Sequence, residues 1–185
     1  AQHCSIASLG EKIKENTIVV NGVSKSYAMT GWRIGYTASA LPIAKAMGSL
    51  QSHVTSNPNS IAQYASVAAL NGPREELAAM VKEFSERREL MVKLINGIDG
   101  LSCVPPKGAF YVMMNVTSAF GKSYHGKKIE TSDDFCSAAL DGVKVALVPG
   151  GPFLAEGFCR LSYATSRKNI EEGLARIAQF MSELV

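Results

Sequence analysis

One short segment, residues 24–36, combines a lysine, an arginine and several hydroxyl groups. Lys25 lies between Ser24 and Ser26, and Arg33 follows eight positions later between two glycine-containing stretches. A lysine amine can form an imine with an aldehyde cofactor, and a guanidinium can bind a phosphate through two parallel N–H donors. The Ser24 and Ser26 hydroxyls are further candidates for that phosphate. The segment therefore predicts a site for a cofactor that carries both an aldehyde and a phosphate.

Two other interpretations apply to the same segment. Lys25 and Arg33 could be ordinary surface charges around a loop, which is the commonest role for an arbitrary lysine. A nucleotide-binding P-loop is a poor alternative, because the glycine before the lysine and the four-residue spacing of that motif are missing. The full sequence also contains no G-x-G-x-x-G motif.

A third basic residue, Arg160, interrupts the apolar, strand-like run 159–164. An unpaired guanidinium is costly to bury, so a residue in this position requires a carboxylate partner. The residues alone leave two sources open: a fixed side chain of the protein, or the carboxylate of a ligand.

Hydrophobic patterns predict the elements that position these residues. Short apolar runs bounded by turn residues predict strands over 17–20, 34–38, 101–104, 109–114, 143–148 and 159–164. Helical spacing and cap signals predict helices over 41–53, 61–70, 74–98, 131–141 and 168–184. We therefore expect an α/β protein with two domains, 1–95 and 96–185, whose boundary lies inside the long helix near Ile95.

Composition restricts the class of protein. The chain has 185 residues, 46% of them hydrophobic and 19% charged, which is ordinary for a globular protein. Its net charge of +3 comes from scattered basic residues, which favours a solvated surface over a nucleic-acid interface. The four cysteines are widely spaced and form no C-x-x-C, so we expect free thiols in a reducing cytoplasm, with neither a metal site nor a disulfide framework. No apolar run approaches the ~20 residues of a membrane span, and we expect no membrane partner.

Residues 24–36, Ser-Lys-Ser-Tyr-Ala-Met-Thr-Gly-Trp-Arg-Ile-Gly-Tyr, closely resemble the pyridoxal-phosphate lysine signature of class I (fold-type I) aminotransferases, the aspartate aminotransferase family. The resemblance implies that Lys25 forms a Schiff base with pyridoxal 5'-phosphate and that Arg33 and Ser24 bind its phosphate. One position departs from the pattern. Many members carry a phosphate-binding serine three residues before the lysine, where this chain has Gly22, so phosphate binding would depend on Arg33, Ser24 and residues from elsewhere.

A second match lies near the C-terminus. Residues 148–153 followed by 159–164 are similar to the family segment in which an arginine on a small-domain strand binds the α-carboxylate of the substrate. The resemblance assigns that role to Arg160. The family usually continues with glycine after Phe153, and this chain has Leu154. Residues 106–111 resemble the start of a small-domain strand, and residues 56–59 correspond to a dimer-contact stretch.

The resemblance covers this whole chain but only the C-terminal half of the family. It implies the C-terminal part of the pyridoxal-phosphate-dependent transferase fold: part of the large-domain parallel sheet region and an α/β small domain. It also implies a homodimer that transfers an amino group from an L-amino acid, with aspartate favoured, to a 2-oxo acid. In relatives, an aspartate that protonates the cofactor's pyridine nitrogen and a tyrosine three residues later (Asp-x-x-Tyr) lie just upstream of the matching segment, and this chain has no aspartate before Asp99. We therefore expect a fragment of a longer enzyme that is inactive alone.

Three alternatives stay open. Aromatic, alanine and prephenate aminotransferases share the signature closely enough to compete with an aspartate enzyme. An aminotransferase-like domain could instead sense the cofactor within a transcriptional regulator, which would require a DNA-binding domain upstream. The chain could also be a structural remnant that binds no cofactor.

Overall fold

A computed structural model describes residues 3–185. The chain forms two compact units that divide at residues 79 and 80, within helix α4 (Glu75–Asn96). The sequence predicts a boundary in this same helix. The specific domain limits 1–95 and 96–185 stay a prediction.

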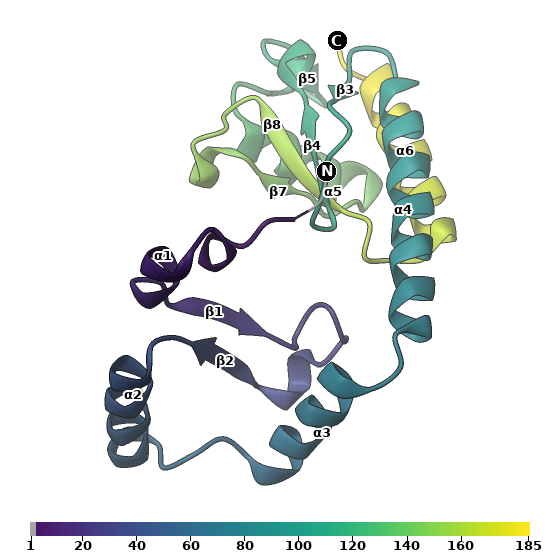
Figure 1. Cartoon of the computed structure of the whole chain (residues 1–185). Coiled ribbons are helices and arrows are strands. Elements are labelled where there is room, and N and C mark those ends of the chain that lie inside the picture. The colour runs from purple at the N-terminus through teal and green to yellow at the C-terminus, as the bar shows by residue number, and fades with distance from the viewer. Residues whose placement is uncertain (1–2) are drawn as a thin grey trace. The chain divides into compact units, whose positions relative to one another are not determined.

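The first unit is built around two antiparallel strands, β1 (Val19–Gly22) and β2 (Gly35–Ala38). Gly22 lies opposite Gly35, so the pair closes a loop over residues 23–34. The helical elements of this unit are η1 (Ile6–Ser8), α1 (Glu11–Glu15), η2 (Thr30–Trp32), α2 (Leu41–Val54) and α3 (Ser60–Asn71), as Figure 1 shows. All strand pairs described for residues 3–185 are antiparallel. The β1–β2 pair is antiparallel because the chain turns back through residues 23–34.

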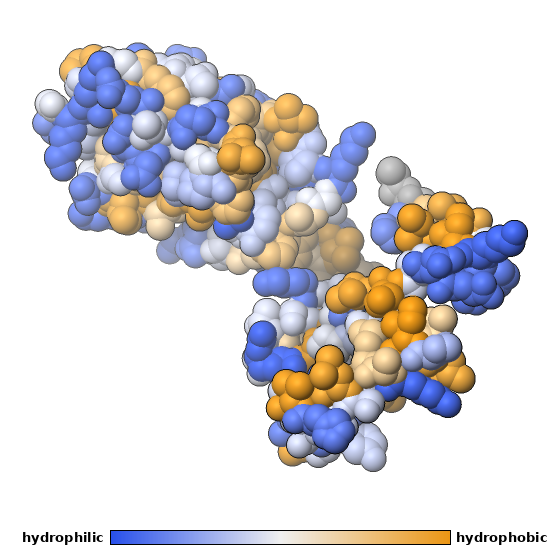
Figure 2. Space-filling view, turned by 90° about the vertical axis from the view of Figure 1, so that its left-hand side faces the viewer, coloured by the Kyte–Doolittle hydropathy of each residue, from blue (hydrophilic) through white to orange (hydrophobic). Residues whose placement is uncertain are grey.

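The core of the first unit is small. Val23, Met29 and Ile34 from the β1–β2 loop are buried against Ala62 of α3. Many large apolar side chains of the unit are exposed instead, on α1, β1, α2 and α3. Figure 2 shows such apolar side chains gathered on the surface of this unit. Four buried residues give the loop a local anchor but little apolar burial to stabilise the unit as a whole.

The second unit contains a four-stranded antiparallel sheet in the order β3–β4–β8–β7. Its strands are β3 (Ser102–Cys103), β4 (Tyr111–Asn115), β8 (Phe158–Ser162) and β7 (Val148–Pro149). A separate hairpin joins β5 (Ser123–Tyr124) and β6 (Lys127–Lys128). The remaining helical elements are η3 (Thr117–Ala119), α5 (Ser132–Val143), η4 (Gly151–Phe153) and α6 (Arg167–Ser182).

A single large core holds the second unit together. Alternate residues of β4 and β8 are buried, as expected for strands with one face against helices. Helix α6 buries a stripe at helical spacing: Ile170, Leu174, Ile177, Phe180 and Met181. Phe135 of α5 meets Phe180 edge-on, with ring centroids 5.2 Å apart. The predicted terminal helix is thus confirmed, and its amphipathic pattern is explained by this core.

The predicted helices are confirmed with small shifts at their ends, and Thr131 caps α5 in a reciprocal pair with Asp134. The predicted strand over 143–148 is wrong. Helix α5 continues to Val143, Lys144 adopts a left-handed conformation (φ 59), and pairing begins only at Val148. Val145 and Leu147 are half-buried beside the core, and neither is paired in the sheet. The short elements α1, β5 and β6 had no counterpart in the sequence pattern.

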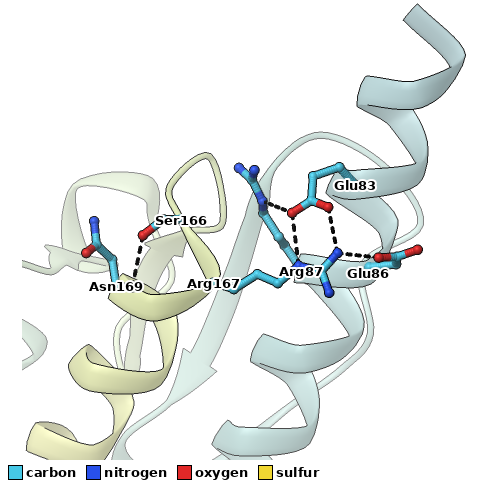
Figure 3. A network of polar contacts seen from close by, with 6 residues as sticks. All are labelled: Glu83, Glu86, Arg87, Ser166, Arg167 and Asn169. Carbon is cyan, nitrogen blue, oxygen red and sulfur yellow. Dashed lines mark hydrogen bonds and ion pairs between the residues drawn. The ribbon is translucent and has the colours of Figure 1, made fainter. Parts of the chain in front are cut away.

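A network of charges joins α4 to the start of α6 (Figure 3). The Arg167 guanidinium donates to both carboxylate oxygens of Glu83, at 3.0 and 2.6 Å, and also pairs with Glu86. Arg87 donates to Glu83 as well, at 2.8 Å. These two guanidinium groups hold the pKa of the Glu83 carboxyl at about 2, well below its usual range. The network therefore fixes the segment that follows β8.

Among residues 3–185, no helix is both long enough and apolar enough to cross a bilayer.

Candidate functional site

Lys25 lies in the loop that β1 and β2 close, three residues beyond Gly22. Two backbone hydrogen bonds shape this part of the loop: Tyr27 N donates to Val23 O and Ala28 N donates to Lys25 O, both at 3.2 Å. The buried side chain of Val23 anchors the turn, whereas the Lys25 side chain is exposed. The sequence thus places a lysine amine on a fixed turn at the end of a strand.

Arg33 lies in the same loop, two residues before Gly35. Its backbone is left-handed (φ 56), an uncommon conformation for a residue with a side chain. Its Nη1 donates to Thr30 O at 3.0 Å, which uses one of the five N–H donors of the guanidinium. Neighbouring Ile34 is buried, so the loop holds Arg33 between a fixed contact and the small core.

The glycine pair explains why the loop closes tightly. A Cβ atom on Gly22 would lie 3.2 Å from Ile34 O, and one on Gly35 would lie 3.4 Å from Asn21 O. A serine at position 22, as many relatives of the resembled family carry, would require the Ile34 carbonyl to shift by a few tenths of an ångström. The glycine at position 22, where the family often has serine, therefore permits the close pairing of β1 and β2 at Gly22 and Gly35.

The donors of this loop fit the cofactor that the resemblance implies. A primary amine, a guanidinium and the hydroxyls of Ser24 and Ser26 all belong to residues 23–34, which one strand pair closes. Such groups suit a ligand that carries an aldehyde and a dianionic phosphate. The part of the chain that the structure describes holds no cluster of three metal-ligating side chains. The loop is thus a candidate cofactor site without metal ligands.

Arg160 occupies the middle of β8 in the second unit, between Met113 of β4 and Val148 of β7. Its guanidinium carbon lies 4.4 Å from the ring centroid of Tyr111 and 4.8 Å from that of Phe153. Within residues 80–185, no carboxylate forms an ion pair with it. The expected carboxylate partner is therefore not a fixed side chain of this unit, and two aromatic rings contact the cation instead.

Phe153 reaches Arg160 from a braced loop. Gly150 N donates to Phe158 O at 2.8 Å, and Phe153 N donates to Gly150 O at 2.8 Å. The carboxylate of Glu156 accepts from the backbone N–H groups of Ser132 and Gly157. These hydrogen bonds lower the pKa of the Glu156 carboxyl. The brace ties the Phe153 loop to the N-terminus of α5.

A cavity of about 410 Å³ lies beside Arg160 in the second unit. Its walls come from β8, the run 145–148 and helix α6, and they are mainly apolar. Ser162, Thr165 and Asn169 add polar groups to this lining. A small ligand bound in this cavity would contact Arg160 and the neighbouring residues of β8.

The structure thus brings Lys25 and Arg33 onto one loop of the first unit and surrounds Arg160 with aromatic rings in the second. The sequence did not reveal the contacts of Tyr111 and Phe153 with Arg160. The only hint of these contacts in the sequence is Arg160 itself, because a half-buried cation on a strand needs neighbouring groups that interact favourably with its charge. Finding those neighbours requires the pairing of β4 with β8, which local spacing does not give.

Comparisons with known proteins identify the family of this chain. The model for the family "Aminotransferase class I and II" matches residues 2–177. An aspartate aminotransferase of Rhizobium meliloti (strain 1021) is 49% identical over 173 residues, which cover 93% of this chain and 42% of that protein. An aspartate/prephenate aminotransferase of Nitrosomonas europaea is 45% identical, over 92% of this chain and 43% of that protein.

A solved structure gives the same result for the fold. The crystal structure of the aspartate aminotransferase from Rhizobium meliloti matches with a TM-score of 0.93 and 46% identity, over 99% of this chain and 46% of that chain. This match confirms the α/β class and a partial pyridoxal-phosphate-dependent transferase fold. The chain spans less than half the length of the relatives it matches. The chain belongs to the class I and II aminotransferase family.

Proposed function

We propose that the protein containing this chain transfers an amino group from an L-amino acid to a 2-oxo acid with pyridoxal 5'-phosphate as cofactor. The observation that carries the proposal is the Lys25–Arg33 loop, whose amine and guanidinium suit the two ends of that cofactor. Aspartate is the favoured amino donor, supported by the names of the most similar relatives. The relative named for aspartate and prephenate supports keeping prephenate as a second substrate for testing.

Each residue has a defined task in this proposal. When bound, the cofactor supplies an electron sink for the bonds at the substrate's α-carbon. The Nζ atom of Lys25 holds the aldehyde end of the cofactor and, once the substrate amine has displaced it, moves the α-proton. Arg33 binds the phosphate through paired N–H donors, and the Ser24 hydroxyl adds another donor.

Arg160 is the proposed ligand for the substrate's α-carboxylate. Rings that stack on the faces of a guanidinium leave its edge, where the N–H donors lie, open to a planar acceptor. Tyr111 and Phe153 contact Arg160 at 4.4 and 4.8 Å from their ring centroids, so they restrict the plane of the guanidinium. A carboxylate of the substrate can then pair with the Arg160 guanidinium through two parallel hydrogen bonds, and this neutralises a charge that no carboxylate of residues 80–185 pairs with.

Incubation with pyridoxal phosphate tests the cofactor site directly. We expect an imine absorption band and, after borohydride reduction, a covalent adduct that mass spectrometry maps to Lys25. Lys25→Ala should abolish both signals, and Lys45→Ala is a matched control because Lys45 is an exposed lysine of the same unit. Arg160→Lys should keep both signals, because Arg160 is assigned to the substrate. An adduct spread equally over Lys25 and Lys45 would contradict the proposal and support the non-catalytic remnant.

The 185-residue chain by itself should not transaminate. It has no aspartate before Asp99 to keep the cofactor's pyridine nitrogen protonated, and it spans less than half of its relatives. The measurement is turnover of aspartate and 2-oxoglutarate by the purified chain with added cofactor. Detectable turnover that Lys25→Ala removes would overturn this expectation while supporting the assignment of Lys25.

We also propose a homodimer for the intact protein, which the family supports, and a cytoplasmic location, which the widely spaced cysteines support. Sedimentation of the intact protein measures its oligomeric state, and fractionation of source cells measures its location.

The coding sequence upstream of Ala1 distinguishes an enzyme from a regulator. An Asp-x-x-Tyr there favours the enzyme, and a DNA-binding domain favours the regulator.

A further inference from the structure

Two cysteines far apart in the sequence meet in the core of the second unit. Cys136 lies on α5 and Cys159 on β8, and their sulfur atoms are 3.4 Å apart. Both thiols are free, and both are buried. Because side chains alternate across a strand, Cys159 lies on the opposite face of β8 from its neighbour Arg160. The pair is therefore separate from the proposed carboxylate ligand.

The two thiols have unequal surroundings. Cys159 is fully buried, whereas Cys136 keeps 7% of its surface exposed. The single S–H of Cys159 has two acceptors nearby: the Cys136 sulfur, and Ser132 O at 3.8 Å. The hydrogen bond with Cys159 lowers the pKa of the Cys136 thiol, although burial and the carboxylates of Asp133 and Glu156 oppose its ionisation. The same contact and burial raise the pKa of the Cys159 thiol. Cys136 is thus the more accessible and the more acidic partner.

The two sulfur atoms already touch within the folded unit. A disulfide has an S–S length of about 2.0 Å, so the two sulfurs must approach by about 1.4 Å. Rotation of the two side chains within the contact between α5 and β8 can supply part of that movement. Once an oxidant has converted one of the two thiols to a sulfenic acid, the thiol already in contact with it attacks it faster than a thiol of another molecule can.

We propose that Cys136 and Cys159 form a dithiol site that a peroxide oxidises to a disulfide. The Cys136 thiolate attacks a peroxide oxygen, the O–O bond breaks, and a sulfenic acid forms as hydroxide leaves to become water. The Cys159 sulfur then attacks the Cys136 sulfur, an S–S bond forms, the S–O bond breaks, and the Cys159 proton leaves with a second water. The two thiols lose two electrons in total, and the peroxide gains them.

Peptide mapping of the oxidised chain tests the site. Trypsin cleavage at Lys128, Lys144 and Arg160 gives the peptides 129–144 and 145–160, each with one cysteine of the pair. After treatment of the folded chain with hydrogen peroxide and alkylation of remaining thiols, we expect these peptides as one cross-linked species. Its mass is the sum of the two less two hydrogens, and dithiothreitol separates them. Exposed Cys4 serves as the internal sign that oxidant reached the protein.

Single variants separate the two roles. Cys159→Ser should leave Cys136 as a sulfenic acid that dimedone traps, whereas Cys136→Ser should leave fully buried Cys159 reduced. Cys103→Ser is the matched control and should leave the cross-link unchanged, because Cys103 lies outside the pair. If Cys4 is oxidised while peptides 129–144 and 145–160 stay alkylated, or if they join only in denaturant, the proposal fails. If a variant does not fold, peptide mapping of the peroxide-treated chain without substitutions still tests the proposal.

Discussion

The two units differ in how they bury apolar surface. The second unit collects twenty-one buried apolar residues in one cluster, whereas the first has four. Large apolar side chains such as Ile18, Leu41 and Tyr64 remain exposed in the first unit. Because burial of apolar surface is the main stabilising contribution to a fold, the second unit has its own source of stability and the first has little.

The residues proposed to bind cofactor and substrate lie in units with cores of different size. The proposed cofactor loop with Lys25 lies in the unit with the small core, and Arg160 lies in the unit with the large core. Ligand binding adds stability wherever it favours the folded state. A bound cofactor would therefore add stability to the unit whose own core is the smaller.

A matched pair of isoleucines gives the largest test of this difference. Ile95 is fully buried in the second unit, and Ile34 is 8% exposed in the small core of the first. Ile95→Ala should lower the free energy of unfolding by about 2–5 kcal/mol, as usual for a cavity in a packed core. Ile34→Ala should cost clearly less in urea unfolding followed by circular dichroism. Equal losses would show that both units depend on their cores to the same degree.

A second test compares tight turns in the two units. A Cβ on Gly150 would lie 2.2 Å from Ala155 O and 2.5 Å from Phe158 O, whereas one on Gly22 would lie 3.2 Å from Ile34 O. Gly150→Ala should therefore cost about 1–3 kcal/mol, typical of overpacking, and Gly22→Ala should cost less. Thermal unfolding of both variants measures this. A larger loss for Gly22→Ala would reverse the assignment of the tighter turn.

The smallest expected effect concerns the charges between α4 and α6. The pKa of Glu83 is held at about 2 by Arg167 and Arg87, so its stabilising effect is full above the ordinary glutamate pKa and is lost as pH falls through about 2. Glu83→Gln should lower the melting temperature modestly at pH 7, and the difference from the parent should shrink toward pH 2. Glu89→Gln is the control, since Glu89 is mostly exposed and pairs with Arg88 only at 3.7 Å. A difference that stays constant over this pH range would refute the effect.

Local sequence signals were sufficient for the longer helices, α2 to α6. The assignment of Lys25 and Arg33 to a cofactor stays a proposal. Apolar spacing located α6, and the Thr131 cap located the start of α5. The strand predicted over 143–148 was wrong, because an apolar, β-branched stretch has the same sequence pattern whether it pairs in a sheet or lies unpaired beside the core. The rings on Arg160 and the meeting of Cys136 with Cys159 depend on long-range strand pairing, which a sequence pattern does not contain.

The strand registers also set an order of assembly. The β1–β2 pair joins Gly22 to Gly35 across a short loop, whereas β4 and β8 pair Tyr111 with Ser162, with α5 lying between them in the chain. Closing the longer loop costs more entropy, and non-local pairings form slowly. On a ribosome, where N-terminal segments emerge first, both strands beside the lysine loop have been synthesised before the strand that carries Arg160. The chain would therefore acquire the group proposed to hold the cofactor earlier than the group proposed to select the substrate.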